Sequence, residues 1–359
     1  MTDLGYSALI EAEKKKIIKM KSMRIMLMLV MVVAIILIMG YSFTVGTSSL
    51  TPVDAYKVLI NQVFPGTFTG IPDNYIFIVT ELRTPRVLVG ALVGMILAMG
   101  GCILQAILKN PLATPYTLGV SSGAGMGASI YFVFGISLVS GTAGLILNSF
   151  ICSIIPAAVM LFALTKKTVS PVTMILSGVA ISYIFSSINM ILQYFGDDAS
   201  ITNVAKWSVG DLTSTSMWMV PIVAVSVVLY FSYGMIVGKD IDILRMGDDS
   251  ANSLGVNVKV IRGVSILVVC IMTAIAVSFT GPIGFVCLLA PHISRKLVGS
   301  DIRWLLPFSA LLGSILLLIS DLISKTIIAP IMLPVGAITA LIGAPVMVYM
   351  LYSRKGLSA

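Results

Sequence analysis

The sequence predicts an all-α, polytopic membrane protein, on three observations. Of the 359 residues, 58% are hydrophobic and 11% are charged, whereas a soluble domain carries roughly 25% charged residues. The apolar residues gather in blocks of about 20, the helix length that crosses the hydrocarbon core of a bilayer. The basic residues between these blocks are divided unevenly between alternate loops. We therefore expect a chain that crosses a membrane several times as helix.

Ten apolar blocks predict ten transmembrane helices. The first follows a polar segment, residues 1–24, which is longer than the start of a signal peptide and precedes no clear cleavage site. The fifth follows a Ser-Pro turn, and the eighth is short and broken by glycine and proline. The blocks lie at about 25–45, 87–108, 116–136, 143–165, 171–195, 217–238, 260–279, 281–298, 304–325 and 334–353.

The distribution of lysine and arginine supports ten spans with both termini in the cytoplasm. In that arrangement 18 basic residues lie inside and five lie outside, namely Lys57, Arg83, Arg86, Lys206 and Lys325. Cytoplasmic loops carry such an excess in membrane proteins. An odd number of spans would place Arg354 and Lys355 on the wrong side. The net charge of +8 follows from this asymmetry and indicates contact of residues 1–24 with anionic membrane lipid, not nucleic-acid binding.

Two connecting loops are long. The outer loop, residues 46–86, contains Pro52, Pro65 and Pro72 and has room for one or two short surface helices. The inner loop, residues 239–259, is too short for a nucleotide-binding domain. The sequence contains no G-x-x-x-x-G-K-[ST] phosphate-binding loop, so any ATP chemistry must come from another protein.

The inner loop carries a predicted helix at Asp248–Leu254. Acidic side chains suit the first turn of a helix, where the helix dipole is positive, and Gly255 follows where a left-handed cap would end it. Ala251 and Leu254 are three residues apart and share one face. That face could bind a soluble partner, or the segment could be a solvated connector.

Glycine and proline interrupt two segments that are otherwise apolar, Asn110–Gly125 and Thr280–Arg295. Broken helices survive in a membrane where protein or a water-filled cavity surrounds them, which is typical of transport pathways. The first opens the third span from inside and the second opens the eighth span from outside. This predicts an inverted repeat of spans 2–5 and 7–10. The pathway candidates are Asn110, Pro111, Gly281, Pro282 and Gly284; the first two could instead be turn residues at a span end.

No metal, cofactor or catalytic site is expected. The single histidine, His292, fits helix packing better than a ligand or proton carrier, and the four cysteines lack metal-site spacing.

Two pairs of charged residues remain to be explained. Arg83 and Arg86 precede a span on the outside, where they could contact a partner or lipid headgroups. Asp321 lies one helical turn before Lys325, which favours an ion pair over a proton relay.

Several motifs together resemble the FecCD-type permeases, the membrane subunits of ABC importers for iron-siderophores, haem and cobalamin. The resemblance covers residues 25–355, and the order of the motifs makes it specific. They are Leu82-Arg83-Thr84-Pro85-Arg86, Asn110-Pro111-Leu112-Ala113, Leu118-Gly119-Val120-Ser121-Ser122-Gly123-Ala124, Gly281-Pro282-Ile283-Gly284-Phe285, Pro291-His292 and Leu333-Pro334-Val335-Gly336.

The resemblance implies the type II ABC importer permease fold, with one ten-span domain over residues 25–355 and no enzyme activity. Such a subunit forms a homodimer, or pairs with a second permease, in the plasma membrane of a prokaryote. Two cytoplasmic ATPase subunits bind ATP and Mg²⁺, and a substrate-binding protein docks outside. Transport then follows alternating access.

Particular residues take roles through this resemblance. Arg83, Arg86 and Lys325 match outer cations that contact the binding protein. Residues of the inner loop match the ATPase coupling element: Gly247, Asp248, Asp249, Ala251, Leu254 and Gly255. The turn Ser170-Pro171-Val172 matches the inner gate. The predicted cargo is an iron chelate, with cobalamin or haem as alternatives. An ion-coupled secondary transporter is the rival hypothesis. Such a transporter needs buried acidic side chains to bind the coupling ion, and Asp321 is a single candidate.

Overall fold

The structure is a computed structural model that describes residues 3–46, 50–166 and 170–352. Lys167, Arg354 and Lys355, three of the basic residues used for the predicted topology, lie outside these ranges. Within them the chain is helical and contains no strand. The helices are α1 (Asp3–Thr44), α2 (Pro52–Val63), α3 (Asp73–Phe77), η1 (Ile78–Arg83), α4 (Thr84–Ile107), η2 (Pro115–Leu118), α5 (Val120–Phe134), α6 (Thr142–Lys166), α7 (Pro171–Tyr194), α8 (Asp198–Ser208), α9 (Met219–Met246), α10 (Asp248–Ser253), α11 (Val258–Thr280), α12 (Val286–Val298), α13 (Ile302–Thr326) and α14 (Val335–Tyr352).

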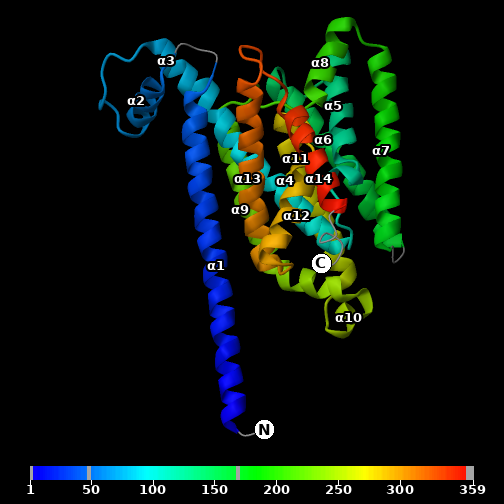
Figure 1. Cartoon of the computed structure of the whole chain (residues 1–359). Coiled ribbons are helices and arrows are strands. Elements are labelled where there is room, and N and C mark those ends of the chain that lie inside the picture. The colour runs from blue at the N-terminus through cyan, green and yellow to red at the C-terminus, as the bar shows by residue number, and fades with distance from the viewer. Residues whose placement is uncertain (1–2, 47–49, 167–169, 353–359) are drawn as a thin grey trace.

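The long helices run side by side and leave the short ones at the two ends of the bundle (Figure 1). The α10 end holds α10 and the start of α1. The α8 end holds α2, α3 and α8. Because α4 runs from α3 toward Lys109, which bonds Asp248 of α10, α4 ends at the α10 end.

Each predicted span coincides with one helix of the bundle. Seven helices are long and apolar enough to cross a membrane, within the ranges that the structure describes. The helices α5, α12 and α14 are shorter, at 15, 13 and 18 residues. The all-helical membrane fold is therefore confirmed, while the number of ten spans stays a prediction.

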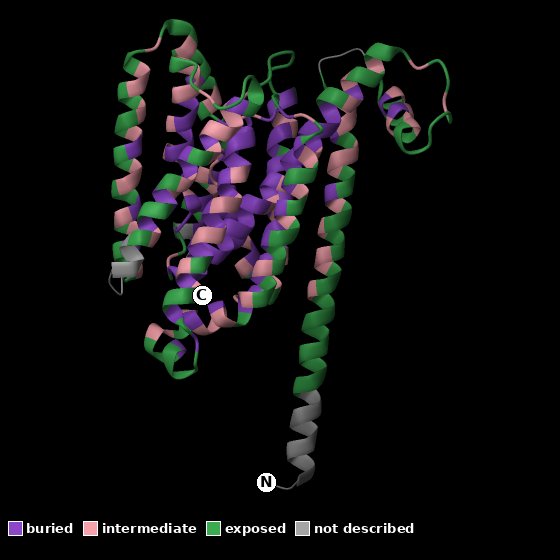
Figure 2. Ribbon diagram, turned by 180° about the vertical axis from the view of Figure 1, so that it is seen from behind, coloured by how far each residue is buried: buried purple, intermediate pink, exposed green. Residues whose placement is uncertain are grey.

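Helix α4 forms the centre of the bundle, and 83% of its most apolar window is buried. It packs against α9, α11, α12 and α13. Buried residues fill the interior of the bundle (Figure 2). The closest crossing joins Gly94 of α4 to Gly313 of α13. A Cβ atom on Gly94 would lie 2.4 Å from the carbonyl oxygen of Gly313, so only glycine allows the two backbones to approach this closely.

Corresponding helices of the two halves pack in corresponding ways. Helix α4 packs on α13, and α11, its counterpart in the second half, packs on α6. Likewise α5 packs on α6 and α7, and α12 packs on α13 and α14. These contacts are what an inverted repeat of spans 2–5 and 7–10 requires.

The outer loop is shorter than the sequence suggested. One or two short helices were expected in it, and two are present, α2 and α3. The chain becomes helical at Asp73 and stays so to Ile107. The π-helix η1 joins α3 to α4, and the Thr84 hydroxyl donates to the carbonyl of Val79 at 2.7 Å. Arg83 and Arg86 therefore lie on a helix. The sequence did not predict α8, which fills much of the connection between α7 and α9.

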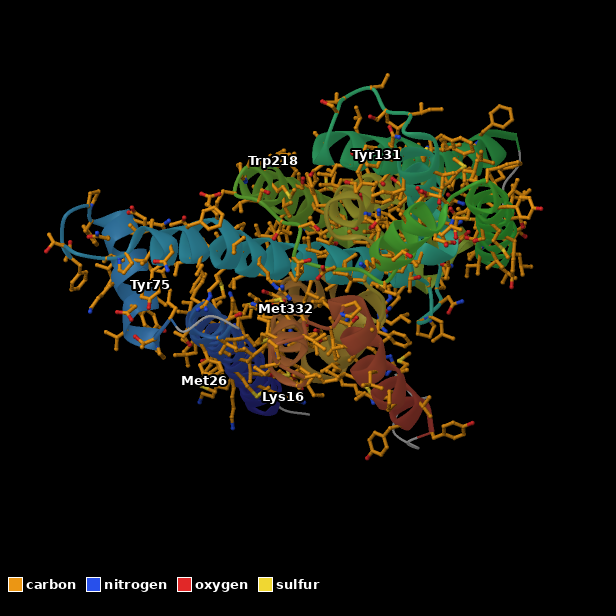
Figure 3. All side chains as sticks on the ribbon, turned by 90° about the horizontal axis from the view of Figure 1, so that it is seen from above. Lys16, Met26, Tyr75, Tyr131, Trp218 and Met332 are labelled. Carbon is orange, nitrogen blue, oxygen red and sulfur yellow. The ribbon has the colours of Figure 1, made fainter. Side chains whose placement is uncertain are left out.

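Two helices at the edges of the bundle bury little of their surface. Only 17% of the apolar window of α1 and 11% of that of α7 is buried. Seen from the α8 end, α1 lies at the rim of the bundle with Lys16 and Met26, far from Tyr131 (Figure 3). Apolar side chains on these edges require lipid or another protein chain as a neighbour.

Candidate functional site

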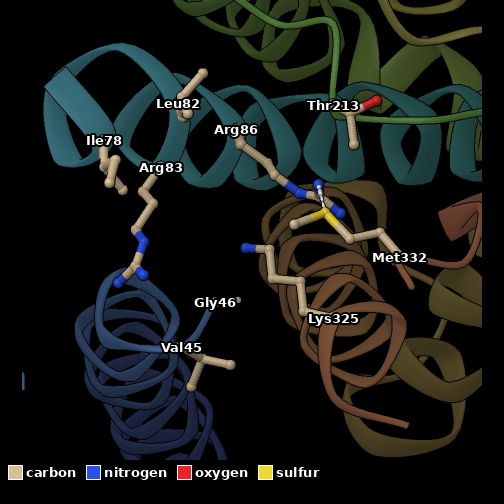
Figure 4. A pocket seen from close by; sticks show the side chains of 9 residues that line it. All are labelled: Val45, Gly46, Ile78, Leu82, Arg83, Arg86, Thr213, Lys325 and Met332. Carbon is tan, nitrogen blue, oxygen red and sulfur yellow. Dashed lines mark hydrogen bonds between the residues drawn. The ribbon is translucent and has the colours of Figure 1, made fainter. Parts of the chain in front are cut away.

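Four charged side chains gather at the α8 end, between η1, α4 and α13, and Figure 4 shows the three cations among them, Arg83, Arg86 and Lys325. The Nε atom of Arg86 donates to Oδ1 of Asp321 at 2.7 Å, and Nζ of Lys325 lies 2.6 Å from Oδ2 of the same carboxylate. Arg83 Nη1 donates to the carbonyl of Phe43 at 2.7 Å. The predicted ion pair of Asp321 with Lys325 is thus confirmed, and Arg86 is a second cation on that carboxylate.

These cations line a cavity of about 340 Å³ between the end of α1 and α13. Arg83, Arg86 and Lys325 are only 6%, 5% and 4% exposed, so their charged groups face the cavity rather than the outer surface. Arg86 and Lys325 share the one carboxylate of Asp321. Their place at the α8 end agrees with the docking prediction, and the docking role itself stays a prediction.

The coupling segment folds at the α10 end as the sequence indicated. Gly247 has φ +139° and precedes α10, whose first turn contains Asp248 and Asp249. Gly255 has φ +82°, the left-handed region that favours glycine. Its N–H donates to Asn252 O at 3.0 Å and that of Val256 to Ala251 O at 2.9 Å, the two bonds of a Schellman cap. The predicted helix and its glycine stop are confirmed.

Asp248 ties this segment to the bundle at two points. Its Oδ2 accepts from Nη1 of Arg262 at 3.1 Å and its Oδ1 from Nη2 of Arg262 at 3.0 Å, while Lys109 Nζ donates to Oδ1 at 2.8 Å. The hydrogen bonds from Arg262 are the main reason that the pKa of Asp248 is lowered from its usual value. The short helix is therefore held by charge on α11 and on the chain just after α4.

The two apolar residues of this segment face opposite ways. Ala251 is fully buried and belongs to the main hydrophobic core, whereas Leu254 is 64% exposed. The expectation that both present one outward face is wrong, because Gly247 and the Asp248 pairing turn the Ala251 side of α10 onto the bundle. Of the pair, Leu254 remains available to a partner.

The two broken segments enter from opposite ends and meet inside the bundle. The hydroxyl of Tyr116, in η2, donates to the carbonyl of Ile283 at 2.9 Å and accepts from its N–H at 3.1 Å. Gly281 has φ +68°, and a Cβ atom there would lie 2.3 Å from the carbonyl of Trp207. The carbonyl of Pro282 lies close to Gly210, whereas a Cβ atom on Gly284 would meet no neighbouring atom. The predicted pathway segments are thus one connected unit.

Around α12 the same unit continues toward the α10 end. A Cβ atom on Gly101 would lie 1.7 Å from the carbonyl of Cys287, so α4 and α12 touch through backbone. Gln105 accepts from Nη2 of Arg295 at 2.9 Å. His292 is 9% exposed, and neither ring nitrogen has a hydrogen-bond partner in the ranges given above, which fits a packing residue.

The remaining gate candidates are turn residues. Asn110 accepts from the N–H of Leu112 at 2.8 Å and, with Pro111, lines a cavity beside Gln105. Ser170 caps α7: its Oγ accepts from the N–H of Thr173 at 3.2 Å. Pro171 occupies the first turn, and Val172 is 66% exposed. These hydrogen bonds explain why the chain turns at these residues. Their role as a gate stays a prediction.

The sequence analysis missed a hydroxyl-rich groove along α7. A cavity of about 320 Å³ is lined by Tyr116 and Thr117 of η2 and by Val179, Ser182, Tyr183 and Ser186 of α7. The i, i+4 spacing of Ser182 and Ser186 on a helix that faces outward was the available signal. Hydroxyl groups on an exposed membrane helix favour contact with water or a polar ligand over lipid.

No group of three or more metal-ligating side chains lies together in the described part of the chain. The four cysteines are separate, free and buried.

Comparison with known proteins identifies the group to which these features belong. The model of the FecCD transport family matches residues 20–353. The chain belongs to the FecCD transport family. Its members are permease subunits of ABC importers, with the ATPase on a separate subunit, so this FecCD permease is a multi-pass membrane protein and not itself an enzyme.

Individual relatives cover nearly the whole FecCD permease. It is 32% identical to the Fe(3+)-citrate import system permease YfmD of Bacillus subtilis, over 93% of this chain and 96% of the relative. It is 34% identical to the hemin transport system permease HmuU of Yersinia pestis, over 80% and 86%. A solved metal-chelate type ABC transporter in an inward-facing conformation superposes with a TM-score of 0.79 at 26% identity, over 91% of this chain and 98% of that one.

Proposed function

We propose that two copies of this chain form the permease of an importer that moves an iron chelate across the plasma membrane by alternating access. Two separate ATPase subunits, which bind ATP and Mg²⁺, drive it, and an external binding protein delivers the cargo. The observation that carries this proposal is the exposed edge of α7, which joins the Tyr116 segment at a hydroxyl-lined groove. An exposed groove of this kind needs a second wall.

A second copy is the wall that best fits α7. The helix leaves Leu176, Tyr183 and Met190 at 64%, 71% and 72% exposed, while Ser182 and Ser186 line the groove beside them. Lipid would cover the apolar side chains but would offer no hydrogen-bond partner to the hydroxyls of Tyr183 and Ser186. The Ser182 hydroxyl already donates to the carbonyl of Gly178 at 2.9 Å. Two α7 helices facing each other about a twofold axis would bury the apolar residues and enclose the hydroxyls as a pathway.

The chemistry of the groove suits a large chelate held weakly. Its six lining residues are uncharged, so a passing ligand would meet hydroxyls and apolar groups but no strong ionic partner. The relatives named for Fe(3+)-citrate and hemin transport make an iron chelate the first choice. Haem and cobalamin remain alternatives for the cargo.

The orientation that we propose places the α10 end in the cytoplasm, with both termini, and the α8 end outside. The cations Arg83, Arg86 and Lys325 then face the side from which a binding protein approaches. Carboxylates of that protein would compete with Asp321 for Arg86 and Lys325. Docking would thus be coupled to a rearrangement of the cluster.

At the other end, α10 is the proposed contact for the ATPase. Leu254 is exposed beside a helix that Asp248 fastens to α11 and to the chain just after α4, so a push on α10 would be passed to the bundle. Asp249, in the exposed first turn, would contribute charge to that contact.

Uptake in proteoliposomes tests the proposal. The chain is reconstituted with its ATPase and binding protein. Uptake is measured with radioactive iron for ferric citrate, a ferric hydroxamate and haemin, and with radioactive cobalt for cobalamin. We expect one ferric chelate to enter only when ATP is present on the ATPase side. Uptake driven by an ion gradient without the ATPase would contradict the proposal and favour a secondary transporter.

A further inference from the structure

A second basic cavity lies at the α10 end, apart from the groove of α7. Its volume is about 250 Å³, and it is lined by Gln105, Lys109, Asn110, Pro111, Arg245 and Arg295. The three cations come from three places far apart in the sequence: the chain just after α4, the last turn of α9 and the last turn of α12. A cavity built this way concentrates positive charge at one point.

The acids near this cavity do not neutralise it. Asp248 is shared between Lys109 and the buried Arg262, at 2.8 and 3.0 Å. Asp242 lies 3.8 Å from Nη1 of Arg245. Two carboxylates, those of Asp248 and Asp242, are therefore shared among Lys109, Arg262 and Arg245. Arg295 adds a fourth cation.

Arg295 is the least satisfied of the cations. Its Nη2 donates at 2.9 Å to Gln105, a neutral side chain. Its Nε is buried and has no hydrogen-bond partner among the residues that the structure describes. A buried N–H of a charged group without a partner costs more than an ordinary lost hydrogen bond, so an anion in the cavity would stabilise it.

A phosphate group fits these donors. Arginine presents its N–H groups in a planar fork that matches phosphate oxygens, and lysine adds a point charge. Basic cavities between the inner ends of transmembrane helices are known to take phospholipid headgroups, and the cavity lies where α4, α9 and α12 end.

We propose that this cavity binds a phosphate group through Arg295, Arg245 and Lys109. The phosphate would come from an anionic phospholipid headgroup or from free inorganic phosphate. The binding does not depend on transport; only the assignment to the inner leaflet rests on the orientation proposed above. Since Lys109 also bonds Asp248, an anion here would lie one residue away from the coupling segment.

Thermal unfolding of the purified full-length chain in a neutral detergent tests this site. The protein is titrated with short-chain phosphatidylglycerol, with short-chain phosphatidylcholine and with inorganic phosphate. The variants are Arg295→Gln and Arg245→Gln. The matched control is Lys296→Gln, which removes an exposed cation next to Arg295 that does not line the cavity.

We expect phosphatidylglycerol to raise the unfolding midpoint of the wild type and of Lys296→Gln, and phosphatidylcholine to have no such effect. The half-saturating concentration should rise about fivefold when one cavity cation is removed. A response to inorganic phosphate with the same dependence on the variants supports the site and assigns free phosphate as its source. If a variant is too unstable to purify, the other one serves, and native mass spectrometry of the wild type counts retained phosphatidylglycerol.

Two results would overturn the proposal. Equal midpoint shifts in the wild type, Arg245→Gln and Arg295→Gln would mean that anionic lipid is attracted only by the general positive charge of this end. Loss of ATPase binding in these variants, without any effect of phosphatidylglycerol or phosphate on the wild type, would assign the cavity to an acidic side chain of the partner.

Discussion

The hydroxyl of Tyr116 bonds both backbone polar groups of Ile283, which lie 167 positions further along the chain. Ile283 is fully buried, so this one side chain satisfies a non-helical peptide unit inside the bundle. It also joins the broken segment of the first half to that of the second. A relative movement of the halves must keep or break this contact.

Removal of that hydroxyl should destabilise the protein. In Tyr116→Phe the N–H and carbonyl of Ile283 lose their partner while remaining buried, which costs about 1–3 kcal/mol. Thermal unfolding in nanodiscs should show a lower midpoint. Tyr349→Phe, at a tyrosine of α14 that is 73% exposed, is the control and should leave the midpoint unchanged. Equal midpoints for both variants would mean that the Tyr116 contact contributes nothing.

Asp321 should be essential for stability at the α8 end. Asp321→Asn leaves Arg86 and Lys325 buried without their carboxylate, which we expect to cost about 3–5 kcal/mol. Asp73→Asn, at an exposed acid of the same end, is the matched control. A second variant, Asp321→Asn with Lys325→Met, should recover part of the loss because one uncompensated charge is gone. A fully stable Asp321→Asn protein would show that the cluster is hydrated rather than paired.

The docking role of the outer cations can be tested at Arg83, which is not bonded to Asp321. Arg83→Gln should weaken binding of the substrate-binding protein by at least about tenfold, since truncating one partner of a desolvated charge pair removes about 2–5 kcal/mol. Binding is measured to the permease in nanodiscs by surface plasmon resonance. Lys57→Gln, on exposed α2, removes the same charge from the same end. Equal affinities for both variants would take Arg83 out of the interface.

Acid should loosen the coupling segment. The pKa of Asp248 is lowered in the folded protein, so the pair with Arg262 stabilises the fold above the unfolded-state pKa of about 3.9. That contribution is lost as the pH falls through the lowered folded-state value. Asp248→Asn should remove this part of the acid dependence, measured as the unfolding midpoint between neutral pH and acid. Parallel pH profiles for the wild type and the variant would contradict it.

Close backbone contact between α4 and α12 should not tolerate a side chain. Gly101→Ala puts a Cβ atom where the carbonyl of Cys287 lies, and overpacking of this kind costs about 1–3 kcal/mol or more. Gly263→Ala, in α11 with its nearest neighbour 4.0 Å away, should be neutral or stabilising. The midpoint of thermal unfolding is measured for both variants. An unchanged midpoint for Gly101→Ala would mean that α4 and α12 can move apart without loss of stability.

The helices could be predicted from the sequence because their cause is local. Apolar blocks of membrane length and capping residues such as Ser170 and Gly255 mark where helices begin and end. Helix α8 was not predicted because its polar composition resembles that of a loop. Its local signal is the capping residue Asp197, whose side chain accepts from the N–H of Ser200 at 2.9 Å.

The site was less predictable because tertiary packing decides it. The positions of Arg83, Arg86 and Lys325 at one end followed from the order of the spans. Their burial depends on how α1 and α13 close over η1, which no local pattern reveals. The same holds for Ala251: its spacing from Leu254 is helical, but the bonds of Asp248 turn it inward.

The central claim is that this permease works through a separate ATPase. The direct measurement is ATP hydrolysis and iron uptake in the same proteoliposomes, with wild-type chain and with Leu254→Asp, whose charge would fall in the proposed ATPase contact. We expect cargo-loaded binding protein to stimulate hydrolysis and uptake together in the wild type, and both to be lost with Leu254→Asp. Uptake that continues with an ATPase unable to hydrolyse ATP would contradict it.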